Sequence, residues 1–378
     1  MLPFSGLFFF CIFIPALIPA VILGLSGKPI KYYGMLFTIA FLIYCFDTTE
    51  KRLALLAFWL LECVLVQLYL RVRKSCDKRY VLWIYLALAL VPILYIKIGP
   101  FVSQSFFPVL GVSYMSFRAI QMLIDIYDGL ITDVKVFDFT YFLLFFPCIS
   151  SGPIDRSRRF FRDINTPMEK EEYISRLKHG IFMVFTGFLY NFVISRLIYL
   201  YVLQKLPETG FLPTLGYMYG YILYLFFDFA GYSGIAVGVS YILGVISPDN
   251  FNMPFISRDL KEFWSRWHMS LSSWLRDYVY TRIVMASLRK KTFKDPHTGS
   301  YIGYAVTMMI MGIWHGLSLN YIVYGAYHGG LMCLNDVLDN KWKSFRKIKR
   351  DDRWHPLLSF ITFNIVAFGL LIFSGRLF

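Results

Sequence analysis

The sequence predicts an all-α polytopic integral membrane protein of 378 residues, and three observations support this fold class. Hydrophobic residues make up 57% of the chain and charged residues only 16%, whereas about a quarter of a soluble chain is usually charged. The apolar residues gather in blocks, and a helix that spans the bilayer needs about 20 residues. The basic residues lie mainly in the connections between those blocks.

The first apolar block, 4–25, differs from a signal peptide because no basic segment precedes it and no small-residue cleavage site follows it. Two later segments, 137–152 and 254–275, also suit re-entrant or interfacial helices. We therefore expect roughly ten to eleven membrane-spanning helices. The further blocks lie near 34–48, 53–70, 81–100, 107–127, 137–152, 180–203, 213–246, 301–319, 320–335 and 357–375.

The net charge of +14 does not indicate a nucleic-acid partner, because the basic residues cluster in short connections. Lys/Arg-rich connections of this kind stay on the cytoplasmic side, where they also attract anionic membrane lipid. The segments 99–106 and 204–216 carry little net charge and are predicted to be external, as is the N-terminus. The basic connections are 71–79, 155–163, 282–294 and 341–353.

The six cysteines are scattered along the chain, and no Cys or His spacing typical of a metal site is present. This pattern predicts neither a disulfide framework nor a bound metal. No internal repeat or linker divides the chain. Residues 1–378 are therefore predicted to form a single membrane domain.

One polar stripe interrupts the apolar segment 111–129. Arg118, Gln121, Asp125 and Asp128 recur at spacings of three and four, which places them on one face of a helix. Such a stripe on a spanning helix must face protein or a wet cavity. A structural Arg–Asp network and a lining of a polar cavity both fit it.

Two further stretches break the rules for membrane helices. In 145–160 the apolar sequence stops at Gly152 and Pro153, which suits either a plain helix end or a re-entrant segment. Asp228 lies among aromatic residues within an apolar block, and an isolated carboxylate there is costly. We expect Asp228 to pair with an arginine from the following segment and to belong to a structural polar network with Arg118 and Asp125.

The segment 254–284 is too charged for a lipid-exposed span and too aromatic for a free loop. Its aromatic and apolar residues recur at spacings of three and four and predict one helical face. An interfacial amphipathic helix and a helix buried against the bundle core both fit, and in the second case His268 points inward. The residues of that face are Trp264, Trp267, His268, Leu271, Trp274, Leu275 and Tyr278.

His315 lies in a run without Asp, Glu, Lys or Arg that reaches from Pro296 to Asn335. An ionisable residue within a membrane segment marks a candidate functional site. His328, which glycines flank, is expected to make a structural hydrogen bond, and His297 is expected to be solvated.

Several of these stretches together resemble one family, the membrane-bound O-acyltransferases, and within it the branch that transfers D-alanine in the teichoic acid system. The resemblance runs from about residue 107 to 375. The two histidine motifs that carry it are FWSRWHMSLSSWLRDYVY (263–280) and MGIWHG (311–316). The supporting motifs are SSGPIDRSRRF, LFFDFAGYS, PFISRDLKEFWSRWHMS and ITFNIVAFGLLIFSG.

The resemblance implies an acyltransferase fold with a central funnel or tunnel, catalytic residues His315 and His268, and a bacterial cell membrane of the Gram-positive type. It also implies a donor, D-alanine held as a thioester on the 4'-phosphopantetheine arm of an acidic cytoplasmic carrier protein. The protein itself would bind no cofactor. The implied partners are that carrier, other membrane proteins of the D-alanylation system, and the hydroxyl groups of teichoic acid outside the cell.

The residues suit this chemistry. Acyl transfer from a thioester needs a base for the attacking hydroxyl and donors for the oxyanion. Imidazole titrates near neutrality, and burial favours the neutral form that accepts a proton. We therefore predict that His315 is the general base and that His268 orients or polarises the substrate.

The stretch 281–295 interleaves apolar and basic residues immediately after the His268 segment. A basic rim around an apolar patch would dock an acidic carrier, although an interfacial helix that binds anionic lipid fits nearly as well. The predicted carrier-docking residues are Arg282, Ile283, Val284, Met285, Leu288 and Lys290.

Two alternatives remain at this point. The nearer one is a member of the same family that acetylates an exported polysaccharide such as alginate. The more distant one is a proton-coupled transporter, in which Asp228, Arg118 and the histidines would form a path. The absence of an inverted repeat in the sequence argues against the transporter.

Overall fold

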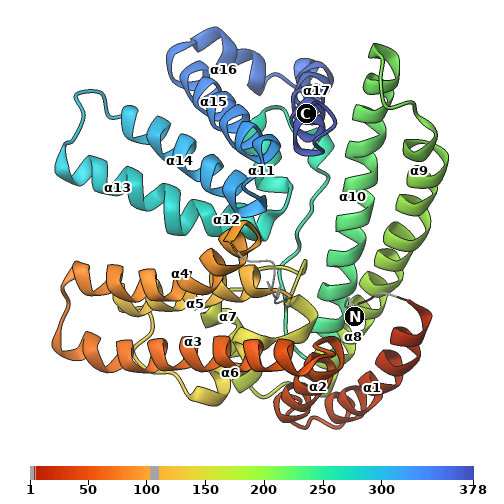
Figure 1. Ribbon diagram of the computed structural model, residues 1–378, viewed down its shortest axis with the longest axis vertical. Coiled ribbons are helices and arrows are strands. Elements are labelled where there is room, and N and C mark those ends of the chain that lie inside the picture. The colour runs from red at the N-terminus through yellow and green to blue at the C-terminus, as the bar shows by residue number, and fades with distance from the viewer. Residues whose placement is uncertain (1–3, 5, 103–109) are drawn as a thin grey trace. The chain divides into compact units, whose positions relative to one another are not determined.

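The computed structural model describes residues 4, 6–102 and 110–378. These residues form helices joined by short connections, and within them a single isolated bridge pairs Phe251 with Trp267 (Figure 1). The predicted all-α class is confirmed. Residues 103–106 of the predicted external loop 99–106 and the start of the predicted block 107–127 lie outside the described residues.

The chain divides into two compact units. The first comprises the chain up to Phe188 together with Tyr232–Pro248, and the second comprises Leu189–Gly231 together with Asp249–Phe378. The long helix α10 (Phe211–Ile242) contributes to both. The single domain stays a prediction, and each unit is described by itself.

The first unit contains eight helices that lie wholly within it, one short 3-10 turn and the end of α10. An aromatic cluster joins α1, α2 and the 3-10 turn: the ring of Phe146 lies 5.3 Å from Phe41 and 6.2 Å from Phe13. The elements are α1 (Leu7–Leu25), α2 (Lys31–Cys45), α3 (Thr49–Ser75), α4 (Arg79–Val102), α5 (Val112–Tyr127), α6 (Val136–Leu144), η1 (Phe146–Cys148), α7 (Ser157–Asn165) and α8 (Lys170–Phe188).

Helix α5 carries the predicted polar stripe. Its Arg118 is fully buried and donates to the carbonyls of Phe142, Leu143 and Cys148 at 3.0, 3.2 and 2.5 Å. Main-chain carbonyls therefore take the place of the carboxylates in the predicted structural Arg–Asp network. These carbonyls have no partner within a helix among the described residues, because α6 ends and irregular backbone follows it. A guanidinium has five N–H donors and can satisfy several such carbonyls together. The stripe therefore ties α5 to segment 142–148.

The predicted block 137–152 does not form one spanning helix. Helix α6 has 9 residues, which is about 14 Å at 1.5 Å per residue, less than half of the hydrocarbon thickness. The chain then continues through η1 into a segment without regular structure up to residue 156. This segment is largely buried in protein, the condition under which irregular backbone is tolerated at membrane depth.

The second unit is built on α14 and α15, which pack along each other, while α15 also contacts α11 and α17. Small residues line the α14–α15 contact: a Cβ on Gly312 would lie 2.5 Å from the Tyr321 carbonyl oxygen. The elements are η2 (Leu189–Ile194), α9 (Ser195–Tyr201), η3 (Leu203–Lys205), the first part of α10, η4 (Pro254–Ile256), α11 (Leu260–Arg266), α12 (Met269–Leu275), η5 (Arg276–Tyr280), α13 (Thr281–Lys290), α14 (Thr298–His315), α15 (Leu319–Lys341), α16 (Lys343–Arg350), η6 (Asp352–Trp354) and α17 (His355–Phe373).

Six helical segments among the described residues are long and apolar enough to cross a membrane. They support the predicted multi-pass membrane protein. Helices α2 and α5 have only 15 and 16 residues, and helices α14 and α15 contain the glycines and polar residues of the motifs. That these four helices cross the membrane therefore stays a prediction. The six segments are Phe8–Leu25, Thr49–Ser75, Arg79–Phe101, Lys170–Lys205, Phe211–Ile242 and Asp352–Phe373.

Candidate active site

The structure brings the two predicted catalytic histidines together within the second unit. His315 is the last residue of α14, and His268 lies between α11 and α12. The ring of Trp314 contacts both, with centroids 4.6 Å from His315 and 6.4 Å from His268. His268 also interacts electrostatically with His315. The two imidazoles therefore share one site.

Aromatic rings hold His315 at the end of α14. Phe373 of α17 lies edge-on at 4.8 Å, and Tyr321 of α15 stacks at 6.0 Å. The residue after His315 must be small, because a Cβ on Gly316 would lie 2.4 Å from the Tyr321 ring. The sequence His315-Gly316 thus lets α14 end while a tyrosine closes over the histidine.

His268 is 4% exposed and has a left-handed backbone, with φ 43° and ψ 50°. Such angles are uncommon for a residue other than glycine and cost of order 1–3 kcal/mol. Neither ring nitrogen has a hydrogen-bond partner among the described residues. Phe229 packs edge-on against the ring at 4.7 Å. A strained, buried and unpartnered imidazole is the kind of feature that active sites contain.

This backbone also corrects the predicted continuous helical face. The chain breaks after Arg266 because the Phe251–Trp267 bridge and the bond from the Met269 N–H to the Asn250 carbonyl, at 2.9 Å, pull it away from helical geometry. Trp264, Trp267, Leu271, Trp274 and Leu275 are nevertheless buried. His268 lies inside, as one of the two interpretations required.

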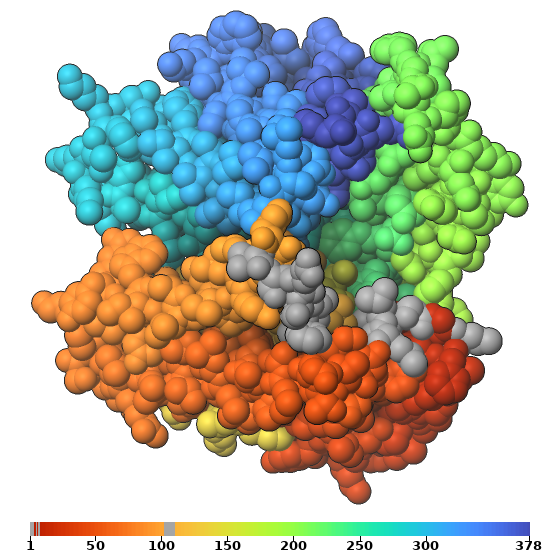
Figure 2. Space-filling model, viewed as in Figure 1, coloured from red at the N-terminus to blue at the C-terminus, as the bar shows by residue number. Residues whose placement is uncertain are grey.

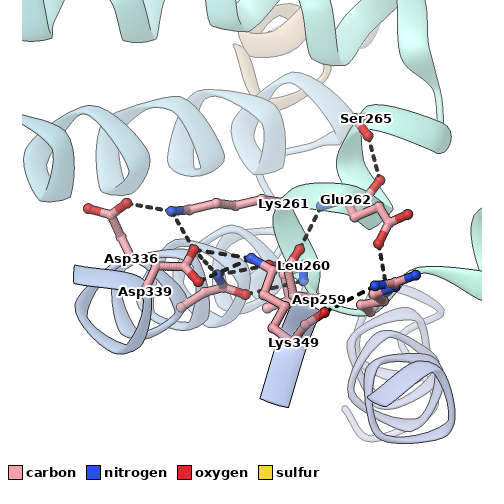
Figure 3. Close-up of polar contacts among 10 residues, drawn as sticks. Asp259, Leu260, Lys261, Glu262, Ser265, Asp336, Asp339 and Lys349 are labelled. Carbon is pink, nitrogen blue, oxygen red and sulfur yellow. Dashed lines mark hydrogen bonds and ion pairs between the residues drawn. The ribbon is translucent and has the colours of Figure 1, made fainter. Parts of the chain in front are cut away.

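A polar network anchors the helix that precedes His268 (Figure 3). Lys261 of α11 donates to Asp336 and Asp339 of α15 at 2.5 and 3.0 Å. Lys349 of α16 pairs with Asp339, at 3.1 Å, and with Asp259. These ion pairs hold α11 against α15 and α16, and they thereby fix where the chain enters the His268 turn.

Asp259 also begins α11, since its carboxylate accepts from the N–H of Glu262 at 2.8 Å. The side-chain oxygen of Asn335 accepts from the Leu260 N–H at 3.3 Å. Two of the free N–H groups at the start of the helix are thereby satisfied. The sequence did not predict this cap and its links to α15 and α16, although the Asp259-x-x-Glu262 pattern is typical of a helix start.

The buried His268 makes the stability of the fold depend on pH, and the stability falls as the pH falls. Burial and the neighbouring His315 lower the pKa of His268 to about 3, whereas the unfolded chain has a pKa near 6.5. Between about pH 3 and 6.5 the unfolded state therefore binds a proton on His268 that the folded state does not bind. The stability that the neutral His268 contributes is complete above about pH 6.5 and is lost as the pH falls toward 3.

The thermal unfolding midpoint of the purified protein should consequently fall between about pH 7.5 and 5. In His268→Gln the midpoint should fall less over the same interval, because glutamine cannot take up the proton. Equal slopes for wild type and variant would show that His268 is not the buried neutral group described above.

His328 is fully buried, but the predicted structural hydrogen bond is wrong. Neither of its ring nitrogens has a partner among the described residues. It is surrounded by rings instead, with Tyr324 at 4.7 Å, Trp264 at 5.2 Å and Tyr327 at 5.2 Å. Through Tyr324, whose ring lies 6.3 Å from His315, it borders the candidate site.

The predicted carrier-docking residues all lie on α13, but they do not share one face. Val284 packs against α14, where a Cβ on Gly303 would lie 3.3 Å from its Cγ2. Arg282 and Ile283 are half-buried, and Lys290 is exposed. Met285 and Leu288 are 43% and 46% exposed and lie three residues apart. The surface of this segment is cyan at the left of Figure 2.

Asp228 does not pair with an arginine as predicted. Its carboxylate accepts from the side-chain amide of Asn191 at 2.9 Å, and its main-chain carbonyl accepts from the same group at 3.0 Å. Asn191 lies on η2, a π-helical turn. The spacing of residues in the sequence does not identify Asn191 as the partner of Asp228. Of the proposed network, Asp125 accepts from Ser157 at 3.1 Å. Arg118 and Asp125 belong to the first unit and Asp228 to the second.

Sequence reasoning missed the aromatic residues that surround the two histidines. They come from four helices, and in the sequence they belong to ordinary apolar runs: Phe229, Trp314, Tyr321, Tyr324 and Phe373. The one available signal was position, because Phe229, Trp314 and Phe373 lie within the motifs LFFDFAGYS, MGIWHG and ITFNIVAFGLLIFSG.

Comparison with known proteins shows which sequences this chain is similar to. Residues 22–374 match the sequence model of the MBOAT, membrane-bound O-acyltransferase family. The chain is 42% identical to a teichoic acid D-alanyltransferase of Bacillus subtilis, over 100% of this chain and 98% of the relative. It is 39% identical to a teichoic acid D-alanyltransferase of Streptococcus thermophilus, over 99% and 95%. A probable alginate O-acetylase of Pseudomonas putida is 31% identical over 73% of this chain and 54% of its own length.

Proposed function

The chain belongs to the membrane-bound O-acyltransferase family and is a multi-pass membrane acyltransferase, and from that premise we propose that it transfers D-alanine to the hydroxyl groups of teichoic acid. The donor is D-alanine held as a thioester on the phosphopantetheine arm of an acidic cytoplasmic carrier protein. The observation that supports this most directly is the shared site of His268 and His315, in a chain similar over its full length to teichoic acid D-alanyltransferases.

In the proposed reaction an imidazole nitrogen of His315 accepts the proton of the attacking hydroxyl. The hydroxyl oxygen then bonds to the thioester carbonyl carbon, the C–S bond breaks, and the thiolate takes up the proton. A general base of this kind contributes about 10²–10⁴-fold to the rate. His268, neutral because burial lowers its pKa to about 3, can donate one N–H to the carbonyl oxygen of the donor. It is therefore a positioning or polarising group.

Met285 and Leu288 form the exposed apolar part of the proposed carrier-docking surface, and the exposed basic residues Arg289 and Lys290 border them. An acidic carrier would bring carboxylates to this basic rim and bury the two apolar side chains. Val284 contributes to the packing of α13 on α14, so a change there would test folding as well as docking.

The function is tested by the transfer of labelled D-alanine from a loaded carrier into membranes that contain this protein.

The docking surface is tested by the association of the carrier with the same membranes. Met285→Glu and Leu288→Glu together should weaken this association at least tenfold, because each inserts a carboxylate into a surface that must face an acidic partner. Ile348→Glu, an equivalent change of an exposed apolar residue on α16, should leave association unchanged.

Unaltered association after the double substitution would refute the docking surface. A wild-type protein that transfers acetyl groups but not D-alanine would instead favour the polysaccharide acetylation suggested by the alginate O-acetylase relatives. If neither donor is used while teichoic acid and the partner membrane proteins are present, the proposed function fails.

We propose the bacterial plasma membrane as the location, with the basic connections and α13 on the cytoplasmic side and the N-terminus external. The carrier then approaches His315 from the cytoplasm, while the acceptor approaches from outside. Other membrane proteins of the D-alanylation system are the expected partners on the acceptor side.

A further inference from the structure

One face of α10 carries a stripe of polar residues that the proposed reaction has not used. Tyr217, Tyr221, Tyr224 and Asp228 recur at spacings of four, three and four, which places them on one side of the helix. The rings of Tyr217 and Tyr221 stack at 5.5 Å, and those of Tyr221 and Tyr224 lie 6.3 Å apart. All four side chains are half-buried. We call these residues the tyrosine stripe.

The tyrosine stripe runs beside the candidate active site. Tyr221 interacts electrostatically with both Tyr321 and Tyr324, the two tyrosines whose rings lie 6.0 and 6.3 Å from His315. At the other end, the residue after Asp228 is Phe229, which packs on His268. A ligand that lies along the stripe would therefore pass the tyrosines that surround His315.

Two arginines accompany the stripe. The Arg376 guanidinium lies 4.3 Å from the centroid of the Tyr217 ring and donates to the carbonyl of Pro207. Arg196 lies 5.5 Å from the centroid of Tyr199, whose ring is 5.8 Å from Tyr224. Within the described part of the chain, neither arginine forms an ion pair with a carboxylate. Their charge is therefore available to an anionic ligand.

This combination fits one chemical class. Tyrosine rings and hydroxyls pack on and hydrogen-bond to a polyol, and an arginine fork binds phosphate. An acyl lipid chain would need neither the row of hydroxyls nor the arginines. The end of the stripe near Arg376 is the start of α10, next to segment 204–216, which is predicted to be external.

We propose that the tyrosine stripe, with Arg376 and Arg196, binds a polyol phosphate segment of the acceptor and directs its free hydroxyl toward His315. This inference rests on the proposed function, since it assigns the acceptor site of that reaction. Arg376 contacts a phosphate of the chain, while Tyr217 and Tyr221 contact the polyol.

The test compares wild type with Arg376→Gln and Tyr221→Ala, using a soluble glycerol phosphate oligomer as acceptor and loaded carrier as donor. Arg376→Gln should raise KM for the oligomer about tenfold and leave kcat within about twofold, because it removes a contact to a part of the acceptor that does not react. With glycerol as acceptor, the same variant should match wild type. The control is Arg353→Gln, whose arginine is exposed and pairs with Asp351 outside the site.

An unchanged KM for the oligomer in Arg376→Gln and Tyr221→Ala would overturn the inference while leaving the proposed function intact. So would an equal rise in KM for glycerol and for the oligomer in Arg376→Gln, because the arginine would then not be recognising phosphate.

If wild type transfers no D-alanine, the reaction assignment fails, and direct binding of the oligomer to the purified protein decides the inference. Binding by wild type that Arg376→Gln weakens tenfold would uphold the stripe as a polyol phosphate site. An absence of binding by wild type would overturn it.

Discussion

Replacing His315 with alanine is expected to reduce D-alanyl transfer by about 10²–10⁴-fold, which is the contribution of a positioned general base. The imidazole lies at the end of α14, held by Trp314, Tyr321 and Phe373 at ring distances of 4.6, 6.0 and 4.8 Å. No other described histidine occupies that position, so the variant has no imidazole at the end of α14 to accept the proton. Initial rates of transfer from loaded carrier measure the effect.

The variant should still insert in the membrane and bind carrier as wild type does, because His315 lies on α14 and the proposed docking residues lie on α13. His297→Ala is the matched control: this histidine is exposed at the start of α14, and only its contact with Asn340, at 3.2 Å, would be lost. Transfer by His315→Ala at the wild-type rate would remove His315 from the chemistry and make His268 the candidate base.

The sequence predicted the helical membrane architecture because a long apolar run in lipid must satisfy its own backbone hydrogen bonds, which a helix does. Helices α3 (Thr49–Ser75) and α4 (Arg79–Val102) cover the predicted blocks 53–70 and 81–100. The turn at His268 could not be predicted in this way. The spacing of Trp264, Leu271 and Trp274 fits a continuous helix, and periodicity does not register one residue in a left-handed conformation.

The partners of buried polar groups were also beyond sequence reasoning. Arg118 and Asp228 were expected to find opposite charges, because an isolated charge in the membrane is costly. Arg118 instead donates to three carbonyls, and Asp228 accepts from an amide. Irregular backbone and π-helical turns supply such partners, and they form only when distant segments come together. The two candidate catalytic histidines were identified through their motifs, but the rings that hold them were not.

The contact between α14 and α15 is expected to depend on Gly312, which lies three residues before His315. A Cβ there would lie 2.5 Å from the Tyr321 carbonyl oxygen and 3.0 Å from the Gly325 Cα. Both are backbone atoms and cannot rotate away, so in Gly312→Ala the two helices must separate. Such overpacking costs about 1–3 kcal/mol. The thermal unfolding midpoint in detergent should fall, and transfer should fall with it.

Gly330 on α15 provides the control, because a Cβ there would meet nothing within 4 Å. Alanine favours a helix over glycine by about 1 kcal/mol in water, so Gly330→Ala should be neutral or stabilising. The same added methyl group is therefore expected to act in opposite directions at two positions of one helix pair. Equal midpoints for the two variants would mean that α14 and α15 are not in close backbone contact. A normal midpoint with lost transfer in Gly312→Ala would mean that the methyl group displaces His315 without opening the contact.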